Sequence, residues 1–286
     1  HPELAFHVDC AQGGRQFVTC GRDTCVRLWD SDSGASQGTL NLHDNHLEYL
    51  AVSATGLVAA GDRNARITVW DADAGTPVFD FHSPRGTVSS ALAWSSTGHL
   101  AHGTIEGDLY ILDSATHSLL AHRRLPDGVQ SLAFAPDGSW LAAGDRNGNL
   151  RIIPFEAGLW DLDTSRTWPA HRGRVFACAV TSDGRRLLSA GEDGCVRAWE
   201  LWASSAHKLV GCESETDSLA VLDDQMLVVG VVGGIELRDR LGNKLRDLTR
   251  QPGTWEVSVA RSVRQVCGGT AGEIVLWSVD DGRELF

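Results

Sequence analysis

Residues 188–200 read L-S-A-G-E-D-G-C-V-R-A-W-E. An apolar start leads into a Gly-Glu-Asp-Gly turn, and an alternating run that ends at Trp199 follows the turn. Side chains of a strand point alternately to its two faces, and Gly and Asp are common in tight turns. This stretch therefore predicts two short strands joined by a hairpin, with a large aromatic residue at the end of the second strand.

The same template recurs along the chain at a nearly constant spacing. When the units are aligned on Trp199, the equivalent positions follow one another at intervals of 39 to 46 residues. They are Trp29, Trp70, Leu112, Ile153, Trp199, Arg238 and Trp277. Each unit also contains an alternating strand, such as residues 129–134, and Gly- or Asp-containing turns. A repeat of about 40 residues built from short strands is typical of a radial repeat protein.

One four-stranded sheet of this size cannot bury both of its faces, whereas seven sheets stacked around an axis can. The sequence therefore predicts an all-β fold, a seven-bladed β-propeller of four-stranded antiparallel blades. We expect a single domain over residues 1–286, with blades at approximately 1–40, 41–81, 82–124, 125–168, 169–211, 212–248 and 249–286. We expect every blade to be contiguous, with residues 282–286 supplying the last strand. A β-sandwich or a parallel β-helix fits this period less well.

The composition restricts the class of partner and the cellular compartment. The formal net charge of −12 argues against non-specific binding to nucleic acid or to an anionic membrane. The seven cysteines contain no C-x-x-C pair, which predicts buried thiols in a reducing, cytoplasmic location. The longest apolar run, residues 226–235, is too short to cross a bilayer. Because the chain starts at His1 without a methionine, we expect it to be part of a longer polypeptide.

Two Trp-Asp pairs, Trp29-Asp30 and Trp70-Asp71, and the near variant Trp199-Glu200 end the third strand of their units. With the period of about 40 residues, they make the sequence resemble the WD-repeat (WD40) propeller family. That resemblance implies a structural network of His, Ser or Thr, Asp and Trp within a blade. The fifth unit supplies His171, Ser189, Asp193 and Trp199, and the first unit supplies His1, Thr19, Asp23 and Trp29.

The other units depart from this network. The second unit has His43 and Trp70, but Ala60 and Asn64 stand in place of the hydroxyl and the acid. The third has His102 with Leu112, and the sixth and seventh lack the acid. We expect all seven blades to form because packing drives them, with turns that are held less firmly where the network is incomplete. The sixth, with Gly233-Gly234 in its second turn, is the least regular.

Ser189, His171 and Asp193 are also the residue types of an acyl-transfer triad. Their recurrence in the first unit favours a structural role, in which the hydroxyl accepts the indole N–H. The Asp-rich turns at Asp30 and Asp71 lack the later acids of a calcium loop, and the 11 histidines show no metal-binding spacing. We predict no catalytic residue, no metal and no cofactor. A channel-centred enzyme would need acids or histidines on the innermost strands, where residues 91–94 and 177–180 are mostly small and apolar.

The resemblance implies that loops around the narrow end of the channel bind peptides through two positions in each blade. The predicted partner-binding residues are Phe6, Arg22, Glu48, Arg63, Arg146, Phe176, Glu192 and Trp255, with Ser218 as the aligned residue of the sixth unit. Three arginines in equivalent turns of an acidic protein indicate a ligand that carries carboxylate or phosphate groups. The alternative is that each arginine pairs with a turn acid such as Asp62 or Asp145.

Fold does not determine function. We expect a non-catalytic scaffold or sensor that binds a protein or peptide partner, acidic or phosphorylated, on the narrow face. The alternative is a regulatory or autoinhibitory propeller in a larger ATPase, kinase or protease, which contacts other domains of its parent chain. A channel-centred enzyme is the remaining alternative.

Overall fold

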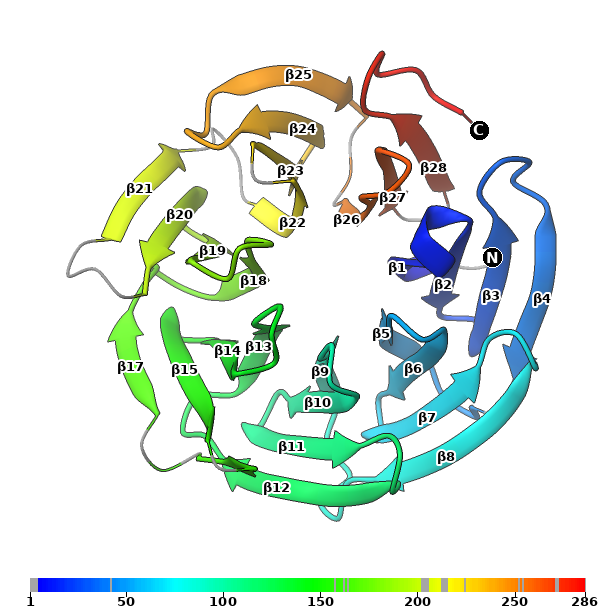
Figure 1. Cartoon of the computed structure of the whole chain (residues 1–286), viewed down its shortest axis with the longest axis vertical. Coiled ribbons are helices and arrows are strands. Elements are labelled where there is room, and N and C mark those ends of the chain that lie inside the picture. Colours follow the sequence, from blue (N-terminus) through cyan, green and yellow to red (C-terminus); the bar gives the residue numbers. More distant parts are fainter. Residues whose placement is uncertain are drawn as a thin grey trace.

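The structure is a computed structural model that describes residues 5–41, 43–156, 158–161, 163, 165–201, 206–211, 216–223, 225–251, 253, 255–270 and 273–285. Seven antiparallel sheets are arranged radially around a central axis (Figure 1). Strands that follow one another in sequence pair within each sheet, so each blade is a meander. The predicted seven-bladed β-propeller is confirmed.

The strands occupy four concentric positions. The innermost strands are β1 (Ala5–Ala11), β5 (Leu47–Val52), β9 (Ser89–Trp94), β13 (Val129–Phe134), β18 (Val175–Val180), β22 (Thr216–Asp223) and β26 (Glu256–Ala260). The second strands are β2 (Gln16–Gly21), β6 (Leu57–Asp62), β10 (His99–Thr104), β14 (Trp140–Asp145), β19 (Arg186–Gly191), β23 (Met226–Val231) and β27 (Gln265–Thr270). The third strands are β3 (Cys25–Asp30), β7 (Arg66–Asp71), β11 (Asp108–Asp113), β15 (Asn149–Glu156), β20 (Cys195–Glu200), β24 (Gly234–Asp239) and β28 (Glu273–Ser278). The outer strands are β4 (Ser36–Asn41), β8 (Thr76–His82), β12 (Ser118–Arg124), β17 (Arg166–Pro169), β21 (Ala206–Gly211) and β25 (Lys244–Thr249).

Two blades depart from the four-stranded pattern. In the fourth blade, β15 pairs with β17 and also with the short β16 (Leu159–Trp160), and this extra hairpin accounts for the longest repeat interval. In the seventh blade three strands pair, and the described chain end adds a single bridge between Glu284 and Trp277. The described chain end thus takes the predicted place beside β28, where Leu285 N–H donates to the Leu276 carbonyl and Ser278 N–H to the Arg283 carbonyl, but it pairs as a single bridge and not as a full strand. The sixth blade forms a complete four-stranded sheet.

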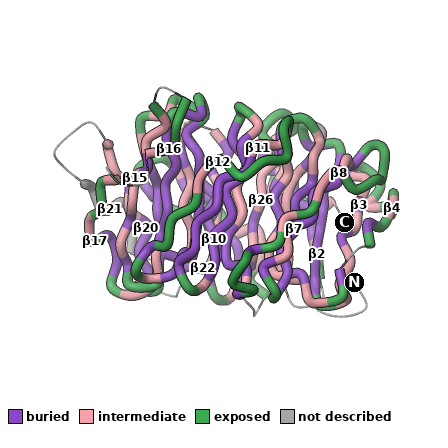
Figure 2. The backbone as a smooth tube through the Cα atoms, turned by 90° about the horizontal axis from the view of Figure 1, so that it is seen from below, coloured by how far each residue is buried: buried purple, intermediate pink, exposed green. Residues whose placement is uncertain are grey.

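The core lies between the blades. Each of the seven buried apolar clusters among the described residues joins two neighbouring blades, including the last and the first. Trp70 packs between the first and second blades, and Trp277 between the sixth and seventh. Figure 2 shows buried residues in the middle of the blades and exposed residues at the turns of both ends. Burial between sheets, which the fold prediction assumed, therefore accounts for the ring.

Hydrogen bonds between neighbouring inner strands add to this packing. Hydroxyl groups donate to a carbonyl oxygen of the next blade: Ser90 to Val129 at 2.5 Å, Ser131 to Val175 at 3.0 Å, and Ser218 to Trp255 at 2.6 Å. The strands approach so closely that a Cβ at Gly144 would lie 2.6 Å from the Val175 side chain. Glycine is therefore required at this position of β14.

One carboxylate connects three blades where the ring closes. Asp9 of β1 accepts hydrogen bonds from the Ser258 hydroxyl of the seventh blade at 2.8 Å and from the Val52 amide of the second blade at 2.9 Å. The Cys10 amide donates a third bond at 2.8 Å. Burial raises the pKa of Asp9, and these bonds oppose the increase. Asp9 is therefore a structural acid, and β1 and β26 lie side by side in Figure 1.

Candidate functional site

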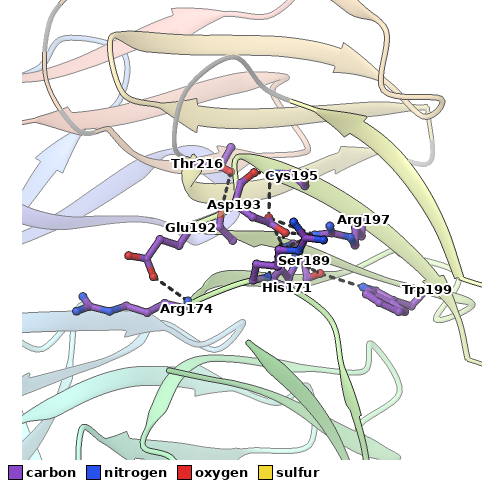
Figure 3. A network of polar contacts seen from close by, with 11 residues as sticks. His171, Arg174, Ser189, Glu192, Asp193, Cys195, Arg197, Trp199 and Thr216 are labelled. Carbon is purple, nitrogen blue, oxygen red and sulfur yellow. Dashed lines mark hydrogen bonds and ion pairs between the residues drawn. The ribbon is translucent and has the colours of Figure 1, made fainter. Parts of the chain in front are cut away.

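The fifth blade holds its network at the end of the propeller that carries the turns between second and third strands. We call this end the upper face and the opposite end the lower face. His171 Nδ1 lies 2.8 Å from Asp193 Oδ1, and His171 Nε2 lies 2.7 Å from Ser189 Oγ (Figure 3). The Trp199 indole N–H donates to Ser189 Oγ at 2.9 Å. The four residues that the resemblance implied are therefore in contact.

The protonation states follow from the surroundings of these groups. Burial alone would raise the pKa of Asp193, but hydrogen bonds from His171 and the Arg172 amide outweigh it and lower the pKa to about 2. Burial lowers the pKa of His171, so the imidazole is neutral at pH 7. Its proton therefore lies on Nδ1, facing the Asp193 carboxylate, and Nε2 accepts the Ser189 hydroxyl proton. Because Ser189 is fully buried and its oxygen accepts from Trp199, this set is structural.

The first blade repeats part of the network. The Trp29 indole donates to the Thr19 hydroxyl at 2.8 Å, as Trp199 does to Ser189. Asp23 forms an ion pair with Arg27 at 2.5 Å, four residues along the chain. The predicted role of His1 lies outside the described residues. The hydroxyl–indole pair of this blade therefore has the same spacing and geometry as the pair in the fifth blade.

The second blade places an acid where the sequence analysis did not look for one. His43 Nδ1 lies 3.1 Å from Asp62 Oδ2, and Asp62 Oδ1 accepts the amides of Asn64 and Arg66. Asp62 stands two positions before Asn64, the aligned acid position. His43 Nε2 is buried and has no hydrogen-bond partner among the described residues, because Ala60 replaces the hydroxyl.

The third blade uses a different set of contacts. His102 occupies the hydroxyl position, and its Nε2 lies 3.1 Å from Ser89 Oγ. Burial lowers the pKa of His102 to about 3, so the ring is neutral. Asp108 pairs with His122 at 2.9 Å, and the ring of His122 stacks on Tyr110. Different sets of side-chain contacts can therefore hold blades of the same geometry.

The structure separates the three predicted arginines. Arg22, Arg63 and Arg146 are all exposed in the upper turns of the first, second and fourth blades. Arg63 forms an ion pair with Glu48 and not with Asp62. Asp145 accepts the amides of Asn147 and Asn149 within its own turn.

Asp62 and Asp145 are therefore not the partners of these arginines, but Arg63 does pair with an acid, Glu48, as the alternative expected in general. Arg146 has no ion pair within 4 Å among the described residues, so its charge is available to a ligand. Glu192, in the equivalent turn of the fifth blade, is exposed and accepts the Arg174 amide at 3.0 Å (Figure 3).

Two predicted contact residues need correction. Trp255 is fully buried and packs against Trp277 with ring centroids 5.7 Å apart, so it is a core residue and not an exposed anchor. In the sixth blade the position equivalent to Phe176 is Asp217 and not Ser218, because a bulge in β22 leaves Asp217 outside the strand pairing. Phe6 and Phe176 both occupy bulges of their strands and are half-buried.

The central channel contains polar groups that the sequence analysis missed. A cavity of about 470 Å³ is lined by residues from all seven innermost strands. His7, Asp9, Asp217 and Glu256 line it, although residues 91–94 and 177–180 are as apolar as expected. Burial and the charge of Asp217 raise the pKa of Glu256 to about 8. The acids follow no single alignment column, so the repeat pattern gives no signal for them.

Metal and membrane features were searched over the described residues. No group of three or more His, Cys, Asp or Glu side chains in this part of the chain could hold a metal ion. No helix there is long and apolar enough to cross a membrane.

Three segments of the chain match the family described as WD domain, G-beta repeat: residues 3–30, 114–153 and 162–200. The first and third segments end at the Trp-acid pairs of the first and fifth blades. The chain is 26% identical over 200 residues to the LST8 homolog of Drosophila melanogaster, covering 65% of this chain and 61% of that protein. It is 25% identical over 219 residues to a guanine nucleotide-binding protein subunit beta of Oryza sativa subsp. indica, covering 70% of this chain and 56% of that protein.

The chain thus spans less than two thirds of the length of these relatives. Among solved structures, the WD40 repeats of RRP9 superpose with a TM-score of 0.82 at 16% identity. That match covers 96% of this chain and 89% of the other. At this identity the match establishes the fold.

Proposed function

We propose that the chain, a seven-bladed β-propeller with three segments that match the WD40 repeat family, is a non-catalytic scaffold that binds a protein partner on its upper face. The observation that supports this most strongly is the upper rim of the channel. There, Arg146 and Glu192 are exposed on turns between second and third strands, Arg63 pairs with Glu48, and Phe176 lines the central cavity. Partly exposed aromatic and arginine side chains are frequent anchors of protein interfaces.

The scaffold presents these side chains on turns that are fixed by hydrogen bonds. Asp62 and Asp145 each accept amide protons within the turn that carries an arginine, and Asp193 does the same beside Glu192. A preformed surface loses little conformational entropy when a partner binds. This rigidity favours recognition of an extended segment or a loop of another protein.

The charges of the upper face indicate which chemical group of the partner binds there. Glu48 already balances Arg63, whereas Arg146 is exposed and forms no ion pair with any residue that the structure describes. We propose that a carboxylate or phosphate group of the partner binds at Arg146, with Arg22 as a second contact. The net charge of −12 supports a partner other than nucleic acid or an anionic membrane.

The rice relative is named as a subunit, which supports a role within an assembly. A regulatory role toward other domains of a longer chain uses the same face and remains a second proposal. We also propose an intracellular setting, because the six described cysteines are free thiols. The absence of catalysis is likewise part of the proposal, supported by the structural use of Ser189 and Asp9.

Affinity capture with two upper-face variants and one lower-face control tests the proposal. Arg146→Glu and Arg63→Glu reverse charge on the upper face, and Arg185→Glu reverses an exposed charge in a lower turn. We expect the same partner to be captured by the unmodified chain and by Arg185→Glu, and to be lost with Arg146→Glu. Circular dichroism checks that each variant is folded. A partner that all four proteins retain equally would refute the upper face as the binding site.

A further inference from the structure

The two sides of the central cavity differ in chemistry. One side is formed by β22, β26, β1 and β5, and it presents Asp217, Glu256, His7 and Tyr49. The other side is formed by β9, β13 and β18 and, apart from Gln130 and Ser131, it presents Ala91, Leu132, Phe176 and Ala177. At about 470 Å³, the cavity is within the usual size range of small-ligand sites. A ligand that suits both sides is polar at one end and apolar along its length.

The polar side carries two acids, Asp217 and Glu256, at the start of β22 and β26; Arg261, which also lines the cavity, follows the other end of β26 and donates to the Val221 carbonyl oxygen. Asp217 and Glu256 lie on neighbouring inner strands, and the charge of Asp217 disfavours ionisation of Glu256. Among the described residues, the basic group near Glu256 is the His7 imidazole. Its Nε2 atom lies 3.9 Å from Glu256 Oε2. Burial lowers the pKa of His7 to about 4, so this ring carries no charge at neutral pH. A cation from outside the chain would favour the ionised form of Glu256.

His7 provides a second observation at the same place. Its Nδ1 atom is buried and has no hydrogen-bond partner among the described residues. The His7 ring lies beside the Tyr49 ring, with centroids 5.8 Å apart. Buried polar atoms normally have partners, so His7 keeps hydrogen-bonding capacity beside Glu256 that the described residues leave unused.

Aromatic side chains complete the lining. Tyr49 and Phe176 come from the second and fifth blades, on different sides of the cavity. Aromatic faces attract ammonium and guanidinium groups, and they also pack against the methylene chains that carry them. Phe176 lies at the bulge of β18, which sets its side chain apart from the ladder of the strand.

We propose that the channel mouth binds an organic cation on an apolar stem, with the ammonium or guanidinium group against Asp217 and Glu256 and the stem against Phe176. The cation could be supplied by a lysine or arginine side chain of the protein partner or by a free amine. The first source rests on the proposed function, whereas the pocket itself does not.

Titration calorimetry with matched probes tests the pocket. The probes are acetyl-Gly-Arg-Gly-amide, the same peptide with citrulline in place of arginine, and free agmatine. Citrulline keeps the shape of arginine and removes its charge. We expect the arginine peptide to bind at least about tenfold more tightly than the citrulline peptide. Glu256→Gln and Asp217→Asn should each weaken its binding by about tenfold or more. Glu200→Gln changes an acid at the end of the third strand of the fifth blade, away from the cavity lining, and should leave the binding unchanged.

Several results would overturn the proposal. They are equal binding of the arginine and citrulline peptides, no binding of any probe at about 10 mM, or undiminished binding by both channel variants. If the arginine peptide binds more tightly than agmatine, the cation comes from a protein chain. If agmatine binds more tightly than the peptide, the cation is a free amine. Affinity capture with Glu256→Gln separates the two proposals. A partner that this variant still captures, and that Arg146→Glu loses, supports the upper face while excluding the pocket as its anchor.

Discussion

The fifth and second blades have the same sheet but different hydrogen bonds at the upper end. In the fifth, both nitrogens of His171 have partners, Asp193 and Ser189. In the second, His43 bonds Asp62, and its other nitrogen has no hydrogen-bond partner in the described part of the chain. The strands of both blades pair over similar lengths. The network therefore fixes the turn that carries the upper-face residues, whereas packing between blades forms the sheet.

The largest effect is expected when the acid is removed from the complete network. Asp193→Ala removes bonds to His171, Arg197 and the Arg172 and Cys195 amides. We expect the free energy of unfolding to fall by about 2–3 kcal/mol, because hydrogen bonds to a charged group are lost in a mostly buried site. Urea denaturation measures this change. Asp62→Ala in the second blade is the matched variant and should cost less; an equal or larger cost would contradict the comparison.

Ser189→Ala converts the fifth blade toward the second. It leaves His171 Nε2 and the Trp199 indole N–H without their shared partner. We expect a loss of about 1–2 kcal/mol in unfolding free energy. Ser189→Thr keeps the hydroxyl, as Thr19 does in the first blade, and should retain most of the stability. A similar loss in both variants would show that the site is sensitive to shape and not to the hydrogen bond.

The reverse change should complete the second blade. Ala60→Ser places a hydroxyl beside the buried Nε2 of His43, and we expect a gain of about 1 kcal/mol. Ala143 is the equivalent position in the fourth blade, where Leu125 stands in place of the histidine. Ala143→Ser should therefore lower stability, because the buried hydroxyl gains no histidine partner. Thermal unfolding of the two variants distinguishes a specific hydrogen bond from a general effect of serine.

The smallest effect is expected on how the free energy of unfolding changes at acidic pH. Asp193 has a folded pKa of about 2, below its ordinary value of 3.8, so its stabilising contribution is present above about pH 4 and is lost toward pH 2. The lowered pKa of His171 acts in the same direction below about pH 6.5, because the unfolded state binds more protons. Urea midpoints should therefore fall on acidification. Asp193→Asn should flatten the part of the curve below pH 4 more than Asp62→Asn does, and parallel curves would be inconsistent with this assignment.

The repeat period was sufficient to predict the fold, because one residue in each unit marks the end of a strand and the core lies between equivalent strands. The network of the fifth blade could be expected only through the resemblance to the WD-repeat family, whose motif its residues match in spacing. The acid of the second blade was not, because Asp62 reaches His43 from two positions earlier in the turn. Spacing rules locate a backbone position, whereas a side chain of two or three bonds can reach the same atom from another position.

The channel shows a second limit of repeat-based prediction. Asp217 lines the cavity because of a bulge in β22, and Trp255 is buried because it packs against Trp277 in the seventh blade. Bulges and aromatic pairs depend on three-dimensional neighbours and not on the position within the repeat. Asp217 and Trp255, whose places the repeat pattern misassigns, therefore both lie where the alignment of the units fails.

The serine hydroxyls of Ser90, Ser131 and Ser218 all donate in the same sense around the ring, each to the blade that follows. Every such junction therefore needs a donor from one repeat and an accepting strand from the next. The transferable unit of this architecture is the boundary between two blades. A chimera that joins two propellers within a blade keeps each junction intact, whereas one that joins them between blades must rebuild a matched donor, acceptor and close strand contact.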